Sequence, residues 1–387
     1  MNIKVNGGEF KKYIGLALKS TASSAINAND IINISTNNDK LIILSGSGSS
    51  DFTLKQELKN VIISEEGNIN ISINISVTIL NAIIKKMTNE EISLFIDPKN
   101  NDVLKIKQGR NNSKIALAKE HTISDILKSD IIYSLNLNPK IFKDLIESTS
   151  YAVAQDEARP ILLGQYIELE NNLIKITALD GFRLISNSAK IENKHEDKIL
   201  IHANNLKNLS SLIDDSTEEL ILNKNNNKAI VEVKNKNYVA IAASNIFSEE
   251  FIEYKQLIGD LSSFPIKITV DRLQLLNTVD RISVVSSFVK EGTHILMKLN
   301  KDSLEIDGNS SVASMKGEVN IKNNNFEEEF TIGFNPKYIL DALKNINTKE
   351  IDMFFNSNVS PAIIINKPEK EEDIKINALV LPVKTIS

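Results

Sequence analysis

The chain has 387 residues, of which 42% are hydrophobic and 25% are charged, so two or three well-filled domains are expected. A formal net charge of −5 argues against a protein that holds nucleic acid by bulk electrostatics, because that affinity comes from Lys and Arg. It does not exclude DNA as a partner, since a protein that encloses DNA needs only a mildly basic inner surface.

Neither a membrane span nor a secretory signal is indicated. No apolar run approaches the roughly 18 residues that a membrane helix needs, and residues 1–5 lack the apolar core of a signal peptide. Cysteine is absent, which excludes disulfides and thiolate chemistry and fits a reducing compartment. We therefore expect a cytoplasmic protein without a membrane partner.

A short strand followed by a helix recurs three times along the chain. Each helix carries apolar residues at the spacing of one helical face. The copies lie about one domain apart, which indicates an internal repeat. The three apolar stripes are Phe10, Tyr13, Ile14, Ala17 and Leu18; Phe142, Leu145, Ile146 and Thr149; and Leu275, Val279 and Ile282.

A second strand and helix lie inside each copy, so each domain contains two similar halves. Alternating segments joined by tight turns, such as 166–169 and 173–176, predict strands between the helices. The stripes of the second helices are Leu80, Ile83, Ile84 and Met87; Leu206, Leu209 and Ile213; and Ile339, Ala342, Leu343 and Ile346.

The repeats predict an α+β chain of six β-α-β-β-β units, two in each of three domains at residues 1–130, 131–263 and 264–387. A solenoid is the alternative for repeats, but its units are about 20 to 50 residues long and stack in many copies. Three large copies instead favour a pseudosymmetric assembly. Head-to-tail dimerisation would close them into a six-domain ring.

The stretch 176–184 differs between the copies. Its Asp180-Gly181 pair predicts a hairpin turn, because Gly tolerates positive φ and Asp bonds its own backbone. Segments 45–50 and 307–312 align with it and are also turn-like, so the turn belongs to the fold. Only the middle copy adds a set of residues that folding alone does not explain, namely Leu179, Phe182, Arg183 and Leu184.

The segment 378–384 predicts the final strand of the last domain. Pro382 has no backbone donor and therefore belongs at a sheet edge or a strand end. We expect an apolar edge that no later strand covers, which is either a liability or a docking site.

Four stretches occur in order, at 156–164, 178–184, 333–343 and 381–384. They read Asp-Glu-Ala-Arg-Pro-Ile-Leu-Leu-Gly, Ala-Leu-Asp-Gly-Phe-Arg-Leu, Gly-Phe-Asn-Pro-Lys-Tyr-Ile-Leu-Asp-Ala-Leu and Leu-Pro-Val-Lys. Together with the threefold repeat they cover the chain, which resembles the bacterial DNA sliding clamps, the beta subunits of DNA polymerase III.

This resemblance implies a non-catalytic processivity factor without a cofactor or metal. Such a clamp is a head-to-tail homodimeric ring, with helices lining the hole and strands outside. It encircles double-stranded DNA without sequence specificity and tethers DNA polymerase, clamp-loader subunits and repair partners.

The resemblance also implies a groove between the second and third domains that binds short linear peptides of the partners. Apolar pockets would take Leu or Phe side chains, and a few polar groups would fix the register of the peptide. The matching positions are Leu162, Leu179, Gly181, Phe182, Arg183, Leu184, Leu257, Asn335, Tyr338, Val359, Pro361, Val380, Leu381, Pro382 and Val383.

For the ring seam, the resemblance points to a first-domain strand against the third domain, at Lys114, Ile115 and Leu117 and at Val284 and Val285. The seam residues could equally be core residues of their own domains. Charges on helices can mark no more than a solvated face. The helix cations that would face the hole are Lys11, Lys12, Lys85, Lys86, Lys140, Lys143, Lys207, Arg272, Lys337 and Lys344.

The chain departs from the family pattern in several places. The family often has Thr and His where Leu179 and Phe182 stand, so this groove wall is more apolar. The usual Phe-Pro-x-Tyr loop is Phe-Ile-Glu-Tyr at 251–254, and Leu-Pro-Ile-Leu near the N-terminus is replaced by 25–29. An Arg that often contacts DNA there is missing. Three extra residues, Thr385-Ile386-Ser387, could reach into the groove.

A cytoplasmic enzyme is the rival class. No phosphate loop and no Gly-x-Gly-x-x-Gly occur, and four scattered His without Cys predict neither a zinc site nor a Cys-His pair. A Ser-His-Asp triad stays open, but no Gly-x-Ser-x-Gly elbow supports one. Acidic pairs such as Asp156-Glu157 are typical of solvated surface. A repeat scaffold unrelated to DNA shares the architecture and is disfavoured only by the motif set.

Overall fold

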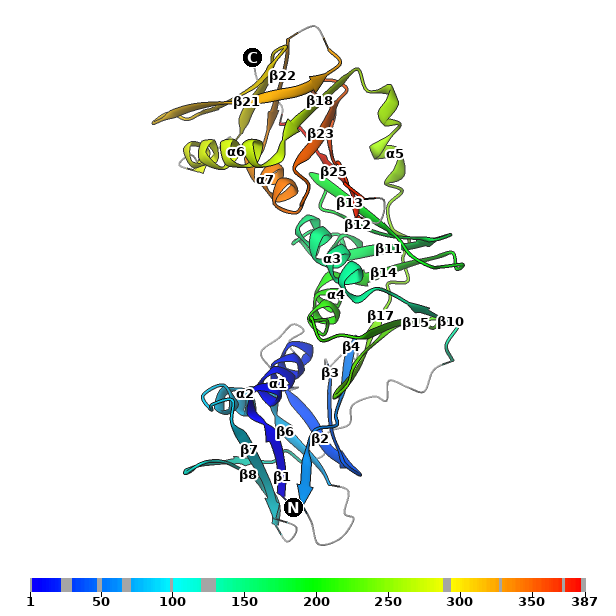
Figure 1. Ribbon diagram of the computed structural model, residues 1–387, viewed down its shortest axis with the longest axis vertical. Coiled ribbons are helices and arrows are strands. Elements are labelled where there is room, and N and C mark those ends of the chain that lie inside the picture. The colour runs from blue at the N-terminus through cyan, green and yellow to red at the C-terminus, as the bar shows by residue number, and fades with distance from the viewer. Residues whose placement is uncertain are drawn as a thin grey trace. The chain divides into compact units, whose positions relative to one another are not determined.

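The protein is described here by a computed structural model, which covers residues 2–21, 30–46, 51–64, 71–97, 100–119, 130–287, 294–326, 329–370 and 373–383. The segment 25–29 and Thr385-Ile386-Ser387 lie outside these ranges. Within them, six β-α-β-β-β units follow one another, and the strand pairings are antiparallel (Figure 1). The predicted α+β class and the repeated unit are confirmed.

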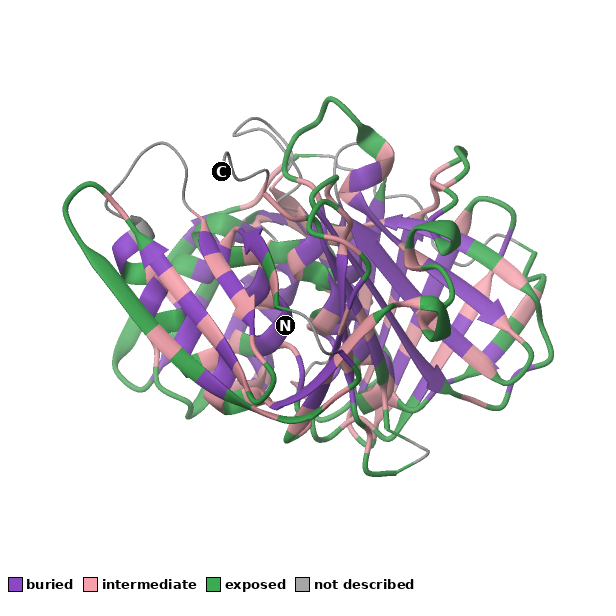
Figure 2. Cartoon of the chain, turned by 90° about the horizontal axis from the view of Figure 1, so that it is seen from above, coloured by how far each residue is buried: buried purple, intermediate pink, exposed green. Residues whose placement is uncertain are grey.

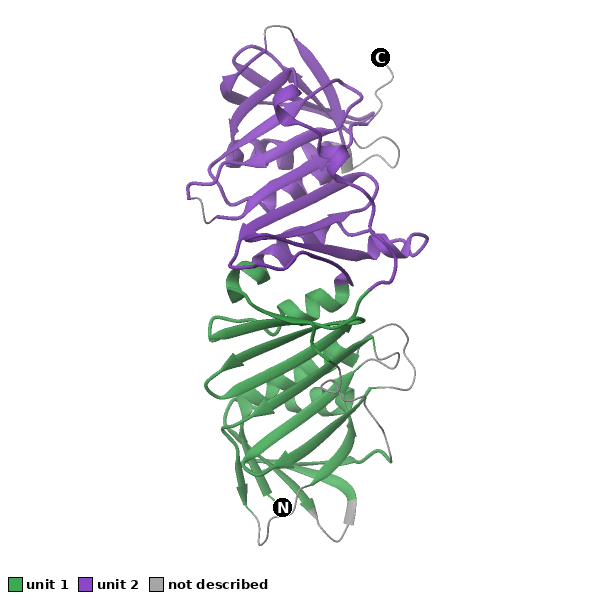
Figure 3. Ribbon diagram, turned by 90° about the vertical axis from the view of Figure 1, so that its right-hand side faces the viewer, with its two compact units in different colours: residues 1–143, 204–246 green, residues 144–203, 247–387 purple. Residues whose placement is uncertain are grey.

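The chain forms two compact units, coloured green and purple in Figure 3. The first contains residues 1–143 and 204–246. It has a five-stranded sheet of order β5-β1-β7-β8-β9 and an eight-stranded sheet of order β10-β15-β16-β17-β4-β3-β2-β6. Its elements are β1 (Asn2–Asn6), α1 (Gly7–Thr21), β2 (Ile31–Asn37), β3 (Lys40–Gly46), β4 (Phe52–Leu58), β5 (Ile62–Ser64), β6 (Ser72–Ser76), α2 (Val77–Ile84), β7 (Glu91–Asp97), β8 (Asn100–Gln108), β9 (Asn111–Ala116), β10 (Tyr133–Asn136), β15 (Glu219–Lys224), β16 (Lys228–Asn235) and β17 (Tyr238–Asn245).

The second unit contains residues 144–203 and 247–387. Its sheet has the order β14-β11-β12-β13-β25-β24-β23-β18-β21-β20-β19-β22. Its elements are the 3-10 helices η1 (Ser150–Ala152), η2 (Pro160–Leu163) and η3 (Leu261–Ser263), the helices α5 (Lys255–Ile258), α6 (Arg272–Ser287) and α7 (Pro336–Lys344), and the strands β11 (Gly164–Glu170), β12 (Leu173–Leu179), β13 (Arg183–Lys190), β14 (Asp197–His202), β18 (Ile266–Asp271), β19 (Ile295–Leu299), β20 (Ser303–Asn309), β21 (Ser314–Asn324), β22 (Phe330–Phe334), β23 (Glu350–Phe355), β24 (Ala362–Asn366) and β25 (Lys375–Val380). The helices α3 (Pro139–Thr149) and α4 (Ala203–Ser210) contain the points of division.

The helices bury the predicted apolar stripes against the sheets. The stripes of α3 and α6 are buried throughout, and strands such as β19 alternate buried and half-buried residues. Figure 2 shows such alternation of buried and half-buried residues along strands of the chain. In α1, however, Leu16 is buried and Leu18 is only half-buried, so the stripe is shifted at its end. Three predicted stripe residues lie beyond the ends of their helices, because α2, α4 and α7 are short: Met87, Ile213 and Ile346.

The final strand is not an edge. β25 pairs with β13 on one side and β24 on the other, so the prediction of an uncovered apolar edge is wrong. The backbone leaves the sheet only after Val380. Pro382 therefore lies past the strand end, where its missing donor disrupts no ladder bond.

The three-domain division at residues 130 and 263 stays a prediction, because the compact units divide the chain elsewhere. In the part of the chain that the structure describes, no helix combines the length and apolar character needed to cross a membrane.

Candidate functional site

The turn between β12 and β13 is held by one carboxylate. Asp180 Oδ1 accepts hydrogen bonds from the backbone N–H groups of Phe182 (2.9 Å) and Arg183 (3.1 Å). Gly181 has a φ of +92°, a conformation that favours glycine. The Asp-Gly pair forms the hairpin as predicted and leaves the Phe182 side chain 58% exposed.

Arg183 is buried beneath this turn. Its Nε donates to Asp180 Oδ2 (3.0 Å), its Nη1 to Asp341 Oδ2 (2.5 Å) and its Nη2 to the Tyr151 carbonyl (2.7 Å). Although burial opposes the charge, the hydrogen bonds to Asp341 and Asp180 raise the pKa of Arg183 above its usual value. The guanidinium therefore joins β13 to α7 and to the 3-10 helix η1.

Two aromatic rings flank the same guanidinium. The ring centroids of Tyr151 and Tyr338 lie 5.1 and 4.7 Å from Arg183 Cζ. Tyr338 also stacks with Phe182, with centroids 5.9 Å apart and an interplanar angle of 22°. The turn is thus packed against helix α7 by side chains as well as by the ion pair.

A small apolar cluster lies behind the turn. Leu162, Leu179 and Leu184, three of the predicted groove residues, are 3%, 7% and 2% exposed and pack with Tyr254 and Leu379. They form a buried floor rather than an open surface. The partly buried residues that cover this floor include Ile161, Tyr166, Phe251, Ile252 and Ile258.

Three neighbouring strands have their ends beside this floor. Arg183 of β13 is opposite Val380 of β25, and Val380 is opposite Ala362 of β24. The Leu381 N–H donates to the Phe182 carbonyl (2.9 Å), so the two residues are adjacent. Since Leu381 is 37% exposed and Phe182 is 58% exposed, an apolar surface lies open at this end of the sheet.

The remaining predicted groove residues differ in exposure and partners. Pro361 precedes β24 and is half-buried, whereas Val359 is 70% exposed. Asn335 is the N-cap of α7, where its side chain accepts from the Lys337 N–H (3.0 Å). Leu257 on α5 is 52% exposed. Two further residues are half-buried after the last strand, namely Pro382 and Val383, and the Val383 N–H bonds the Gly333 carbonyl.

Sequence reasoning missed three residues that hold this region together. Asp341 lies within the matched stretch 333–343, three positions after Tyr338, so helical spacing alone places both on one face. Tyr151 carried no such signal, whereas Tyr254 is the Tyr of the Phe-Ile-Glu-Tyr loop at 251–254. Both reach the site through the packing of distant segments.

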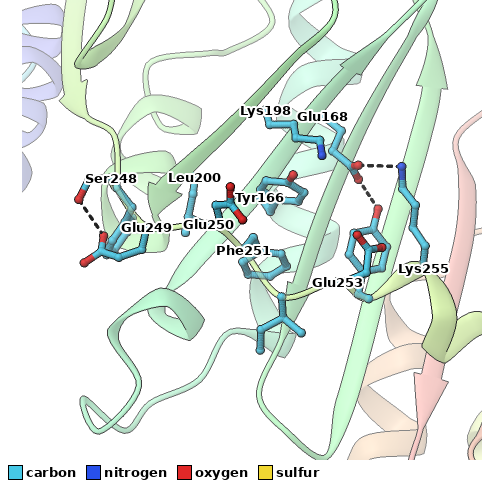
Figure 4. A pocket seen from close by; sticks show the side chains of 13 residues that line it. Tyr166, Glu168, Lys198, Leu200, Ser248, Glu249, Glu250, Phe251, Glu253 and Lys255 are labelled. Atoms are coloured by element: carbon cyan, nitrogen blue, oxygen red, sulfur yellow. Dashed lines mark hydrogen bonds and ion pairs between the residues drawn. The ribbon is translucent and has the colours of Figure 1, made fainter.

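A polar pocket of about 400 Å³ shares Phe251 and Tyr254 with the apolar cluster (Figure 4). The buried Glu168 accepts a short hydrogen bond from the Tyr254 hydroxyl and pairs with Lys255 Nζ (3.0 Å). Tyr166 stacks on Phe251, with centroids 4.7 Å apart, and burial together with Glu168 raises the pKa of Tyr166 to about 12. These contacts anchor the segment that leads into α5.

The arrangement suits binding rather than catalysis. Across the residues that the structure describes, no three His, Cys, Asp or Glu side chains are placed to hold a metal ion. The charged groups of the turn bond one another. What is presented outward beside the turn is apolar surface, at Phe182 and Leu381.

The predicted seam residues lie on β9 and α6 or next to β9. Ile115 and Val285 are each 4% exposed, whereas Val284 is 53% exposed and Lys114 is exposed. Leu117 is half-buried after β9.

The predicted DNA-facing cations fall into two groups. Four bond to their own unit: Lys11 to Met87 and Asn89, Lys12 to Asp214, Lys143 to Ile213, and Arg272 to Leu343 and Thr348. The other six are exposed on helices or directly after one, namely Lys85, Lys86, Lys140, Lys207, Lys337 and Lys344.

Comparison with known proteins places two segments in one family. Residues 136–246 match the central domain, and residues 262–384 the C-terminal domain, of the DNA polymerase III beta subunit. The chain is 27% identical over 382 residues to the beta sliding clamp of Rickettsia bellii, covering 94% of this chain and 95% of that one. It is 26% identical over 309 residues to the beta sliding clamp of Staphylococcus epidermidis, covering 78% and 77%.

The fold is also that of solved structures. The crystal structure of the DNA polymerase III beta chain from Streptococcus pneumoniae superposes with a TM-score of 0.85 at 19% identity, covering 99% of this chain and 100% of that one.

Proposed function

Because this chain belongs to the bacterial DNA polymerase III beta subunits, the sliding clamps, we propose that it closes into a head-to-tail homodimeric ring around duplex DNA. The family consists of non-catalytic processivity factors of DNA replication, and this chain is one of them. The ring leaves DNA only by opening, so a tethered polymerase rebinds at high effective concentration. The proposal includes a cytoplasmic location and three clamp domains, 1–130, 131–263 and 264–387.

Two strand edges support ring closure. β9 is the outer strand of the five-stranded sheet. In the described part of the second unit, β21 pairs with β20 along residues 314–320, while β18 reaches β21 only at Ile321, Asn323 and Asn324. Within the described residues, β9 and residues 314–320 thus each have one side without a partner strand. Such edges can pair with another chain, and their similar lengths suit a contact between two copies.

The seam is tested by substitution on α6. Val284→Asp places a charge at a 53% exposed position of the proposed seam, and we expect monomers in sedimentation velocity. Leu273→Asp is the matched control, because it lies on the same helix and is 52% exposed. Ile115 is a poorer choice, since it is 4% exposed and a charge there would disturb its own sheet. If Val284→Asp sediments as the native dimer does, the seam is misplaced.

Encirclement has its own test. Exposed helix lysines need offer only weak sliding contacts to phosphates, which an overall charge of −5 permits. After loading by a clamp loader, we expect much longer retention on closed circular DNA than on the same DNA made linear. Equal retention on the two forms would rule out a topological link.

We further propose that the apolar surface around Phe182 and Leu381 captures short peptides of partner proteins such as polymerase and the clamp loader. The observation that carries this proposal is the adjacency of these two exposed residues, which the hydrogen bond from the Leu381 N–H to the Phe182 carbonyl joins. Exposed apolar patches of this kind mark interaction sites in soluble proteins.

The groove is tested with the hexapeptide amide Gly-Ser-Leu-Ser-Leu-Phe, which carries a fluorescent dye on its N-terminal amine. Leu381→Asp should weaken its binding at least tenfold in fluorescence anisotropy, because an aspartate would face the apolar ligand. Ile62→Asp is the control: it adds the same charge at a 60% exposed site on β5. Leu184 is less informative, since it is 2% exposed and supports the floor. An unchanged affinity of Leu381→Asp would remove Leu381 from the site.

A further inference from the structure

The five-stranded sheet of the first unit has one face in the core and one face open. Ile3, Leu94 and Ile106 are at most 2% exposed and belong to the core face. Successive side chains of a strand lie on opposite faces, so the alternate residues of β1, β7 and β8 lie on the other face. Figure 1 shows these three strands side by side. Their outward residues therefore form one continuous surface.

Strand register brings one aromatic ring and three lysines together on the open face. Phe95 of β7 is opposite Lys105 of β8, and Lys105 is opposite Lys114 of β9. Lys107 lies two residues further along β8, opposite Ser93 of β7, and is therefore on the same face. Phe95 is 41% exposed, and all three lysines are exposed. We call these four residues, Phe95, Lys105, Lys107 and Lys114, the basic face.

The lysines of the basic face are not neutralised by neighbouring carboxylates. Among the side chains that the structure describes, none of the three makes an ion pair, and Lys105 Nζ lies 5.4 Å from the centroid of the Phe95 ring. The nearby Lys4 of β1 differs, because it pairs with Glu91 (3.0 Å). In a chain with a net charge of −5, this face is a local concentration of positive charge. Such a concentration attracts an anionic partner.

The residue types of the basic face favour one class of anion. Proteins hold single-stranded nucleic acids without sequence preference by stacking bases on aromatic rings while cations follow the phosphates. Lysine is a compact charge on a flexible stem, which suits phosphates at variable positions. Carboxylates and phosphopeptides are instead bound in fixed geometry by the planar guanidinium of arginine. A ring among lysines on an open sheet therefore fits a single strand better than an acidic or phosphorylated peptide.

We propose that the basic face binds single-stranded nucleic acid, with one base stacked on Phe95 and the flanking phosphates at Lys105 and Lys107. Lys105 is exposed and its stem is flexible, so its ammonium can move from the ring to a phosphate and leave the ring to the base. Lys114 lies on the outer strand, at the proposed seam, and contacts the strand of nucleic acid only at the sheet edge. The basic face shares no residue with the peptide groove or with the helix lysines proposed to face the hole, so the inference depends on neither.

The first test measures the binding of a fluorescent thymidine dodecamer to the full-length protein by fluorescence anisotropy at low ionic strength. Lys105→Glu combined with Lys107→Glu should weaken binding at least tenfold, because two attractive contacts to phosphates become repulsive. The matched control is Lys85→Glu combined with Lys86→Glu, which makes the same charge change at two exposed lysines directly after α2. This control should bind as the native protein does. The proposal is overturned if the native protein does not bind the dodecamer, or if the basic-face variant binds at least as well as the control.

The second test determines whether a base stacks on the ring. The comparison strand is an abasic dodecamer, which has the same phosphates but no bases. We expect the native protein to bind the thymidine strand about fivefold more tightly or better, the lower end of base–aromatic stacking energies expressed as affinity. Phe95→Leu should abolish this preference and Phe95→Tyr should keep it, with circular dichroism as the check on folding. Equal binding of the two strands by the native protein would rule out stacking on Phe95.

An acidic peptide separates the two classes of partner. A glutamate dodecapeptide carries a similar charge but no planar base, so the native protein should bind it more weakly than the thymidine dodecamer. If the peptide binds as tightly as the dodecamer, the basic face takes acidic peptides and the assignment to nucleic acid is wrong.

Discussion

Two hairpins of the second unit occupy the same place in successive repeats, yet only one lies at the proposed peptide groove. In the β12–β13 hairpin, Asp180 Oδ1 accepts from the N–H groups two and three residues ahead, and its own N–H donates to the Arg183 carbonyl. In the β20–β21 hairpin, Ser310 Oγ accepts at the same two spacings, and its N–H donates to the Ala313 carbonyl. The predicted alignment of the two turns is confirmed.

The difference lies in what surrounds the turns. β13 pairs with β12 and β25, and Arg183 is buried against α7. The start of β21 pairs only with β20 within the described residues, and Val312, the counterpart of Phe182, is 75% exposed. The same turn thus lies at the wall of the proposed groove in one repeat and, within the described residues, at a free strand edge in the next. The turn itself serves folding in both repeats. The strands and helices packed around it determine whether it also lies at the proposed groove.

The largest expected difference in unfolding free energy is between substitutions of the residue that follows each turn, Arg183 in one hairpin and Ala313 in the other. Arg183→Met leaves two carboxylates near a buried apolar side chain, and we expect a loss of about 3 kcal/mol of unfolding free energy. Ala313→Met, at the exposed counterpart, should change it by less than about 0.5 kcal/mol. Urea denaturation followed by circular dichroism measures both. Equal losses of unfolding free energy would contradict the conclusion that only the β12–β13 hairpin is packed against neighbouring elements at this position.

Exchanging the residues that cap the two turns, Asp180 and Ser310, should change the unfolding free energy less. Asp180→Ser keeps a side-chain acceptor for the turn, as Ser310 shows, but removes the ionic partner of Arg183. We expect a loss of about 1.5–3 kcal/mol, the range for hydrogen bonds to charged groups. The reverse exchange, Ser310→Asp, should be tolerated, because an aspartate can accept the same two backbone N–H groups, as Asp180 does in its own turn. The comparison fails if the two exchanges shift the denaturation midpoint alike.

The two turns differ in backbone conformation at the residue that follows the cap, Gly181 in one and Ser311 in the other. Gly181 has a φ of +92°, whereas Ser311 is not among the residues with positive φ. Nothing lies within 4 Å of a Cβ placed on Gly181, so Gly181→Ala adds backbone strain alone, about 1–2 kcal/mol. Ser311→Ala should leave the thermal midpoint unchanged. A neutral Gly181→Ala would show that the turn readily adopts another geometry.

The smallest effect on stability is expected for a substitution of Lys316 on β21. Hydrogen bonds to Asp307 and Glu305 raise the pKa of Lys316 above its usual value, so its contribution is present below that value and is lost as pH rises through the shifted pKa. Because Lys316 is fully exposed, water screens the pair, and Lys316→Met should not measurably change the thermal midpoint at pH 7. A clear drop would indicate that this hairpin is as tightly coupled as the other.

Much of the candidate site could be predicted from the sequence, because it depends on residues that are close together in the chain. Asp180-Gly181 predicts its turn without reference to any other segment, and the stripe around Tyr338 predicts helix α7. The burial of Leu162, Leu179 and Leu184 was not readable, since an apolar residue in a strand can face either a core or a ligand. The same holds for Arg183, which spacing alone would place at the surface.

The sequence by itself determined the six repeated units, the aligned turns and the family, because helical stripes, turn residues and ordered motifs depend on neighbours in the chain. Only the tertiary structure decided that β25 lies between β13 and β24 and that Tyr338 and Tyr151 lie against the Arg183 guanidinium, with Phe182 stacked on Tyr338. These features require segments nearly two hundred residues apart, such as 183–188 and 375–380, to pair in one register. The packing of the whole core determines which strands pair, and no local sequence pattern identifies the partner of a given strand.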